Sequence, residues 1–414
     1  MASYPKEGYE PEKHIIAIQK GLSNKESLER GFICMQTFNF RGEVTLSRLG
    51  MGAMRLPMKE EAGSPIDVEK AQEIIDYAVK NGVNYFDTAY VYHEGKSEEF
   101  LGKALSKYPR DSFYVADKFN YMANPDYKAQ FAEQLDRLQM DRIDFYLLHA
   151  VSDDLMDQLL SCGCIDYFDQ MKAEGKIRYF GFSFHGTPDA LRKMVSLHSW
   201  DFVQIQLNYY DWLFGDAKEL YEILEQANIP ITVMEPVRGG RLATLSDEID
   251  RTLAQAIPGR SVASWALRWL MRLPQVGVTL SGMSSLDQIK DNVDTFSEYQ
   301  PLLDGQADLL LKMAAEFKKR FRLHVRDAVI AALTVRRELI FRVFWRFIIS
   351  TSWAARGSSA RWISCRRASV RRTASAAAHV RRTVRRISMF RRICRRWRRR
   401  APDYRKALAF SLFS

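Results

Sequence analysis

The stretch "DVEKAQEIIDYAVKNGVNYFDTA", residues 67–89, contains the repeating unit of this chain. Its first part carries apolar residues at helical spacing and reaches Gly82, a residue type that commonly ends helices. A short apolar run follows and ends at the polar residue Asp87. The same alternation recurs from residue 46 to about residue 295 as eight strand–helix units. A helix between successive strands requires those strands to be parallel.

Eight such units in about 250 residues predict an α/β fold, a closed (β/α)8 or TIM barrel. The expected strands lie within residues 46–54, 83–89, 112–119, 142–150, 177–183, 202–208, 229–235 and 276–282. The expected helices lie within residues 67–82, 97–108, 127–140, 159–176, 188–197, 217–228, 261–272 and 285–293. Ahead of the barrel, residues 36–49 predict a hairpin that turns at Arg41-Gly42 and plugs the barrel bottom.

Polar side chains follow three of these strands, at the end where TIM barrels hold their active sites. "FDTAYVYHEG" supplies Asp87 and Tyr92, "VADKFN" supplies Lys118, and "YLLHA" supplies His149. We therefore expect the four side chains around one mouth of the barrel.

This order and spacing resembles the aldo-keto reductase family over roughly residues 36–320. The resemblance implies hydride transfer between NAD(P)H and a small carbonyl or alcohol. Tyr92 would donate a proton to the carbonyl oxygen, and Lys118 would lower the pKa of that phenol. Asp87 would hold Lys118 charged, and His149 would orient the carbonyl. Tyr90 is the nearest rival acid, but the resemblance favours Tyr92, five residues after Asp87.

The resemblance also implies a dinucleotide site around the same mouth. Its expected residues are Gly52, Ala53, Met54, Ser183, Gln204, Met234, Pro236, Gly239, Gly240, Ser281, Gly282, Met283, Gln288 and Asn292. Ser183 and Gln204 would contact the carboxamide, and Gly239 and Gly240 would let the backbone approach the pyrophosphate. Asn292 would contact adenine on a helix whose N-terminus suits phosphate.

Four positions depart from the usual family pattern. Phe184 stands where relatives often carry Asn, and Met234 stands where many stack an aromatic ring on nicotinamide. Gly282 and Gln288 occupy positions where NADP-preferring relatives usually offer Lys or Arg. The expected cofactor is therefore NADP(H) or NAD(H), with NADP favoured by the family and Arg238 or Arg241 as substitute cations.

The charge of the chain is divided unevenly. The net charge is +11, but residues 322–414 hold 25 basic and three acidic residues, a balance of +22. The first 321 residues therefore carry −11. All but one of the 25 basic residues are arginine. Natural basic arms usually mix in lysine, so the bias indicates codon composition and favours a frameshift over a nucleic-acid-binding arm.

A one-base shift of the tail codons reveals a second pattern. Residues 324–342 and 374–391 then permit two C-x2-C-x2-C-x3-C-P runs, the spacing of two-cluster ferredoxins. The hidden cysteines fall at Val325, Ala328, Ala331, Val335, Ala374, Ala377, Val380 and Val384. One branch of aldo-keto reductases resembles this arrangement, a barrel followed by a ferredoxin-like tail with two [4Fe-4S] clusters. The chain as written lacks these cysteines, so no cluster is expected in it, and we expect a tail without a native fold.

These observations divide the chain into three expected parts. Residues 1–34 form a translated leader or a genuine extension, because "MQTFNFRGEV" at Met35 looks like the usual family beginning. Residues 35–320 form the barrel, and residues 321–414 form the frameshifted tail. The five cysteines form no disulfide framework, and Cys162-Gly-Cys164 is too tight for a usual metal pair, so no metal site is expected.

Three functional hypotheses stay open at this point. The first is an NAD(P)H-dependent reductase, and the second is a catalytically silent cofactor-binding regulatory subunit on the same fold. The third is nonspecific nucleic-acid binding through the basic tail. We expect a cytoplasmic protein with no membrane anchor and no specific nucleic-acid partner, because no signal peptide or long apolar run is present. An electron-transfer partner is expected only for the unshifted parent.

Overall fold

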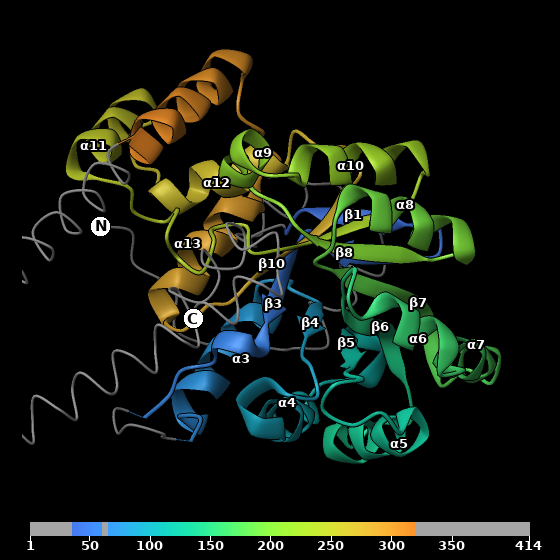
Figure 1. Ribbon diagram of the computed structural model, residues 1–414. Coiled ribbons are helices and arrows are strands. Elements are labelled where there is room, and N and C mark those ends of the chain that lie inside the picture. The colour runs from blue at the N-terminus through green and yellow to red at the C-terminus, as the bar shows by residue number, and fades with distance from the viewer. Residues whose placement is uncertain (1–34, 60–64, 320–414) are drawn as a thin grey trace, which may run out of the picture. The chain divides into compact units, whose positions relative to one another are not determined.

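The computed structural model describes residues 35–59 and 65–319 (Figure 1). Eight parallel strands close into a barrel in the order β10-β3-β4-β5-β6-β7-β8-β9, which confirms the predicted TIM barrel. The strands are β3 (Leu49–Gly52), β4 (Tyr85–Asp87), β5 (Tyr114–Phe119), β6 (Ile143–Val151), β7 (Ile177–Phe184), β8 (Phe202–Gln206), β9 (Ile231–Met234) and β10 (Val276–Ser281).

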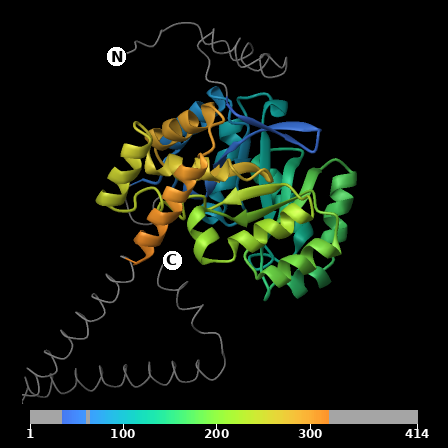
Figure 2. The same cartoon turned by 90° about the horizontal axis from the view of Figure 1, so that it is seen from above.

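The helices lie outside the strands, as Figures 1 and 2 show from two directions. They are α3 (Val68–Lys80), α4 (Lys96–Leu105), α5 (Tyr127–Leu138), α6 (Met156–Ser161), α7 (Cys164–Ala173), α8 (Pro188–Leu197), α9 (Tyr209–Phe214), α10 (Ala217–Gln226), α11 (Asp247–Ala256), α12 (Val262–Leu270) and α13 (Leu286–Ser297), with short 3-10 turns η1 (Ala53–Arg55), η2 (Tyr92–Gly95) and η3 (Arg110–Ser112). Gly82 follows α3 with a φ of 86°, as expected of a helix-ending glycine.

The predicted hairpin is present and consists of β1 (Thr37–Phe40) and β2 (Val44–Ser47). It turns through Arg41 and Gly42, whose φ angles of 54° and 77° both lie in the left-handed region. Phe40 packs edge-on against Phe145 and Tyr179, with ring centroids 5.3 and 4.7 Å away. These rings belong to a buried cluster inside the barrel, so the hairpin fills the end opposite to the polar mouth.

The structure differs from the predicted helices in four places. The single helix expected in residues 159–176 is two helices, α6 and α7, because Gly163 adopts a φ of 79° between them. Residues 209–214, expected to be a loop, form the short helix α9, which Asn208 caps with its side-chain oxygen. Helix α11 and a final helix in residues 304–319 were not predicted.

In the part of the chain that the structure describes, no helix is long and apolar enough to cross a bilayer. The hypotheses on residues 1–34 and on the tail from residue 321 concern segments outside the described residues.

Candidate active site

The barrel brings the four predicted catalytic side chains to its carboxyl-terminal mouth. Asp87 is the last residue of β4, and Tyr92 follows it at the start of η2. Lys118 lies near the end of β5 and His149 near the end of β6. Because β4, β5 and β6 are neighbouring parallel strands, residues at their carboxyl ends necessarily meet.

Lys118 and Asp87 form a buried ion pair. The Lys118 Nζ lies 2.8 Å from each carboxylate oxygen of Asp87 and also donates to the carbonyl of Thr88. Burial raises the pKa of Asp87 above its ordinary value, and the ammonium opposes that shift. For Lys118, burial acts to lower the pKa, but Asp87 and Tyr92 outweigh it, so the pKa lies above its ordinary value. The two-oxygen contact supports a charged pair at neutral pH.

Tyr92 lies directly beside this pair. The Lys118 Nζ is 5.0 Å from the centroid of the Tyr92 ring, and the His149 ring meets the same ring edge-on at 6.1 Å. Burial raises the pKa of the Tyr92 phenol above its ordinary value, and Lys118 opposes the rise. Lys118 therefore acts in the predicted direction, but burial penalises the phenolate more than the lysine stabilises it. Tyr92 is protonated at neutral pH as a result.

The rival tyrosine, Tyr90, has a different environment. Its hydroxyl donates to Glu133 Oε2 on α5 at 2.7 Å, and hydrogen bonding to that carboxylate raises the pKa of the phenol. Tyr90 is not among the residues that line the pocket described below, whereas Tyr92 is. The two phenols therefore differ in position: Tyr92 lies at the pocket and Tyr90 does not.

His149 is held in a neutral form. Burial and the nearby Lys118 charge lower the pKa of His149 to about 3. Its Nδ1 lies 3.1 Å from the side-chain nitrogen of Asn120. Because the amide nitrogen of Asn120 donates, Nδ1 accepts and the proton of the neutral ring resides on Nε2. A neutral histidine with one N–H is suited to donate a hydrogen bond to an uncharged oxygen.

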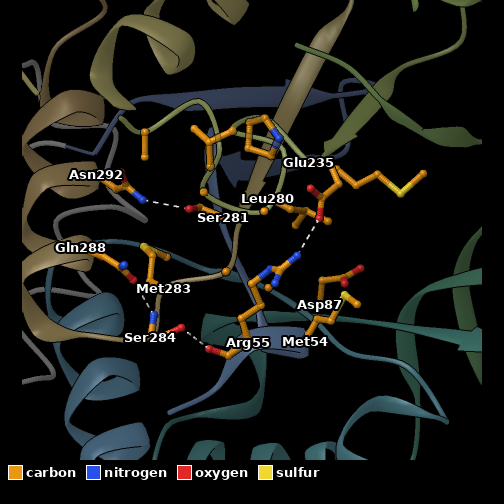
Figure 3. Close-up of a pocket in the computed structure, with 18 of the residues that line it drawn as sticks. Met54, Arg55, Asp87, Glu235, Leu280, Ser281, Met283, Ser284, Gln288 and Asn292 are labelled. Atoms are coloured by element: carbon orange, nitrogen blue, oxygen red, sulfur yellow. Dashed lines mark hydrogen bonds and ion pairs between the residues drawn. The ribbon is translucent and has the colours of Figure 1, made fainter. Parts of the chain in front are cut away.

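A pocket of about 490 Å³ opens at this mouth and extends toward the N-terminus of α13 (Figure 3). Three catalytic candidates, Asp87, Tyr92 and His149, line it, while Lys118 lies behind them with no exposed surface. All but one of the predicted cofactor residues also line it: Gly52, Met54, Ser183, Gln204, Met234, Pro236, Gly239, Gly240, Ser281, Gly282, Met283, Gln288 and Asn292. Ala53 is the exception; it is fully buried, and its carbonyl accepts a hydrogen bond from Ser97.

The pocket wall offers an unpartnered buried acceptor and two glycines with positive φ angles. Gln204 is buried, and its Oε1 has no hydrogen-bond partner among the described residues, although its Nε2 contacts Met234 Sδ at 3.6 Å. A buried acceptor without a partner is costly and suits a ligand that donates, such as a carboxamide. Gly239 and Gly240 have φ angles of 63° and 92°, and a Cβ at Gly239 would meet Arg55 at 2.9 Å. The positive φ angles favour glycine at both positions, and a Cβ at Gly240 would meet no atom within 4 Å.

The end of the pocket next to α13 is built by polar contacts. Asn292 donates to the Ser281 hydroxyl at 2.9 Å, so its side chain is oriented toward the end of β10. The Gln288 side chain accepts from the Ser284 backbone N–H at 2.7 Å. Figure 3 shows both contacts on the same side of the pocket.

Sequence reasoning missed a pair of charged residues on the pocket wall. Arg55 of η1 and Glu235 after β9 form an ion pair of 3.2 Å across the pocket (Figure 3). Neither charged residue stands out in the sequence, and no spacing pairs two residues 180 positions apart. His185 and Asp291 also line the pocket and were not predicted.

A further departure concerns Phe184. Its side chain is buried and packs against Phe182, with ring centroids 6.0 Å apart. Phe184 does not line the pocket, whereas the next residue, His185, does. Phe184 therefore makes no contact inside the pocket, unlike the Asn that relatives often carry at this position.

The fold and this site define a class: an enzyme of the (β/α)8 type, with polar side chains at the carboxyl ends of its strands and a long pocket above them. A family model described as the aldo/keto reductase family matches residues 48–309. The chain therefore belongs to the aldo/keto reductase family of oxidoreductases.

Individual relatives are similar over the barrel. A protein of Escherichia coli called NADH-specific methylglyoxal reductase is 24% identical, over 67% of this chain and 97% of its own length. The L-galactose dehydrogenase of Arabidopsis thaliana is 27% identical, over 62% of this chain and 86% of its own. The solved holo form of an aldo-keto reductase from Bacillus halodurans has a TM-score of 0.56 and 27% identity, over 67% of this chain and 96% of its own.

Proposed function

We propose that this protein is an NAD(P)H-dependent carbonyl reductase with Tyr92 as the proton donor. One observation carries the proposal: the Tyr92 phenol lies between a buried Lys118–Asp87 ion pair and His149, on the wall of a pocket that extends to α13. The family membership and the relatives named for NADH-dependent or dehydrogenase activities support it.

The proposed mechanism assigns a task to each side chain. A bound nicotinamide would supply a hydride to the carbonyl carbon. His149 donates a hydrogen bond to the carbonyl oxygen and orients it. Tyr92 transfers its proton to that oxygen as negative charge develops there, and the Lys118 ammonium stabilises the phenolate that remains. Asp87 keeps Lys118 charged and fixes its position.

The proposed cofactor residues divide into two groups along the pocket. Ser183 and the unpartnered oxygen of Gln204 would hold the carboxamide near Met54 and Met234. Gly239 and Gly240 would face the pyrophosphate, and the α13 end with Asn292 would hold adenosine. The Ser183 hydroxyl accepts a hydrogen bond from the Ala150 N–H at 2.8 Å. Its own proton stays available for a hydrogen bond to a ligand.

We also propose that NADH is preferred over NADPH. Among the described residues that line the pocket, Arg55 is the one Lys or Arg, and it is paired with Glu235. Asp291 lines the adenosine end, where a 2′-phosphate would add negative charge. Arg238, a candidate substitute cation, ion-pairs with Asp211 at 3.4 Å and lies over the Tyr210 ring. The preference inferred from the family resemblance alone was for NADP.

The test of the main proposal is Tyr92→Phe, assayed with NADH and NADPH against aldehydes and ketones that include methylglyoxal. We expect turnover to fall by about 10²–10⁴-fold, the usual contribution of general acid catalysis, with cofactor affinity unchanged. Tyr90→Phe tests the rival phenol and is expected to retain carbonyl reduction. Wild-type-like turnover in Tyr92→Phe refutes the proposal. Tight cofactor binding without turnover on the whole panel supports the alternative, a silent regulatory subunit.

For residues 321–414 we propose a frameshift. In the unshifted parent this segment would be a ferredoxin-like domain that binds two [4Fe-4S] clusters and has an electron-transfer partner. The two hidden C-x2-C-x2-C-x3-C-P runs support it. The DNA sequence across residues 315–395 tests it, and third bases that forbid Cys at the eight sites would reject it. A cytoplasmic setting is part of the proposal, supported by the free thiols of Cys162 and Cys164.

A further inference from the structure

A buried polar cluster lies behind the catalytic lysine, on the helix side of β5. We call Glu98, Asp117, Gln134 and Arg137 the α4–α5 cluster. Asp117 precedes Lys118 in β5, so strand alternation sends its side chain away from the barrel interior that Lys118 faces. Glu98 belongs to α4, and Gln134 and Arg137 belong to α5. Glu98, Asp117 and Gln134 have no exposed surface.

The cluster holds the backbone of Lys118 from both sides. The Lys118 N–H donates to Asp117 Oδ1 at 2.8 Å, and its carbonyl accepts from Gln134 Nε2 at 3.1 Å. The same Gln134 amide donates to Glu98 Oε1 at 3.0 Å. Burial raises the pKa of Asp117 well above its ordinary range, and the neighbouring Glu98 adds to the rise. Asp117 therefore favours its protonated form in this cluster.

Arg137 pairs with Glu98 and carries the contact to the segment that bears Tyr92. Its Nη1 lies 2.7 Å from Glu98 Oε2, while its other terminal nitrogen pairs with Glu133 one turn earlier on α5. The guanidinium carbon lies 4.5 Å from the centroid of the Tyr90 ring, and Nη1 also reaches the Tyr90 carbonyl at 3.5 Å. Tyr90 is two residues before Tyr92.

The far end of the same segment also rests on Arg137. Gly95 has a φ of 85°, and a Cβ placed there would lie 2.8 Å from Arg137 Nη1. Between these ends, His93 and Glu94 adopt left-handed φ angles of 50° and 58°, which cost energy in residues other than glycine. A segment with such a backbone keeps its shape only when its surroundings fix it.

We propose that Arg137 is a positioning residue for the reaction: by clamping residues 90–95 to the Glu98 side of the α4–α5 cluster, it sets the distance of the Tyr92 phenol from Lys118. This inference rests on the proposed function of Tyr92. Arg137 itself touches neither the pocket nor the reacting atoms. It acts through the backbone of residues 90–95. Because the α4–α5 cluster also fixes the backbone of Lys118, this cluster positions both Tyr92 and Lys118.

The consequence for rate follows from geometry. Proton transfer needs the phenol within hydrogen-bond reach of the carbonyl oxygen. A displacement of about 1 Å caused by a substitution remote from the chemistry lowers rate by up to about 100-fold. Cofactor binding depends on residues of the other pocket wall, so it is independent of Arg137.

The experiment is a single-turnover measurement of cofactor oxidation in Arg137→Met, using the full chain and the aldehyde that wild-type reduces fastest. We expect the rate to fall about 10- to 100-fold, with cofactor Kd unchanged. Arg137→Lys keeps one charge but cannot contact Glu98 and Glu133 with separate nitrogens, so it restores the rate only in part. Arg192→Met is the matched control, because Arg192 on α8 also bridges two acids, Asp189 of the same helix and Glu219 of α10.

Removing Arg137 alone leaves Glu98 buried and unpaired, which endangers folding. The double variant Glu98→Gln with Arg137→Met removes both charges and is expected to fold while showing the same slow turnover. A single-turnover rate within twofold of wild type in a folded Arg137→Met or double variant overturns the inference. Tyr92→Phe runs in parallel: a wild-type rate there refutes the proposed function, whereas a slow Tyr92→Phe with fast Arg137 variants refutes only the inference.

Discussion

Replacing Asp87 with Asn tests the electrostatic centre of the site without any assumption about substrate. Lys118 has no exposed surface, and Asp87 supplies its counter-charge through two contacts of 2.8 Å. Without that charge, we expect burial to outweigh the remaining contributions of Tyr92 and Asp117, so that the pKa of the ammonium falls below its ordinary value. The pKa of a buried lysine falls by about three units or more, which corresponds to roughly 4 kcal/mol. Breaking a buried ion pair by removing one partner costs a similar amount, about 3–5 kcal/mol.

The sign of the pH dependence distinguishes wild type from variant. In wild type the pKa of Lys118 is raised, so its stabilising contribution is complete below the unfolded pKa and is lost only as pH rises through the folded pKa. In Asp87→Asn the folded pKa is lowered, so the unfolded chain binds the extra proton and stability rises with pH. Between pH 7 and 9 the deficit of the variant should therefore shrink by up to about 1.4 kcal/mol per pH unit.

Urea unfolding of both proteins at several pH values measures that deficit. Asp189→Asn provides the control, because Asp189 is exposed and its pairing with Arg192 is worth little. Its deficit should stay within about 0.5 kcal/mol at every pH. A deficit of Asp87→Asn that is constant, or that grows toward pH 9, would mean that Asp87 does not hold Lys118 in its charged form.

Three other predictions follow from the pocket. NADH should show a KM about tenfold lower than NADPH in steady-state assays, a difference of about 1.4 kcal/mol, and equal or reversed values would contradict the proposed preference. Gln204→Leu should raise the cofactor Kd by roughly tenfold, the value of one hydrogen bond, as measured by fluorescence titration; an unchanged Kd would remove Gln204 from the binding site. The pKa of His149 is lowered to about 3 in the folded protein, so on acidification the histidine of the unfolded chain is protonated first. The wild type should therefore lose stability relative to His149→Gln as the pH falls from 6.5 toward 4.5, by up to about 1.4 kcal/mol per pH unit. Parallel urea unfolding curves at all these pH values would show that His149 is not held neutral.

The fold was predictable because its signals are local and repeated. Each strand–helix unit carries its own apolar period and its own end signals, such as Gly82 after α3. Eight repeats then leave few ways to close a parallel sheet. The signals failed where a glycine interrupted a continuous helical pattern, as Gly163 does between α6 and α7, and where a polar residue capped an unexpected short helix, as Asn208 does for α9.

The site was predictable only where the strand ends dictate it. Asp87, Lys118 and His149 occupy such ends, so their meeting follows from topology. The Arg55–Glu235 pair and the contacts of Arg137 depend on loop paths and on helix packing, which no sequence period encodes. The net pKa of Tyr92 was also beyond sequence, because burial decides it and burial depends on the whole mouth.

The hairpin closes the floor of the barrel, at the end opposite to the pocket. Its turn at Arg41 and Gly42 is exposed, while the rings beneath it are sealed from solvent. A surface, dye or carrier coupled at that turn would be attached at the barrel end opposite to the pocket, so the barrel offers a handle for oriented immobilisation.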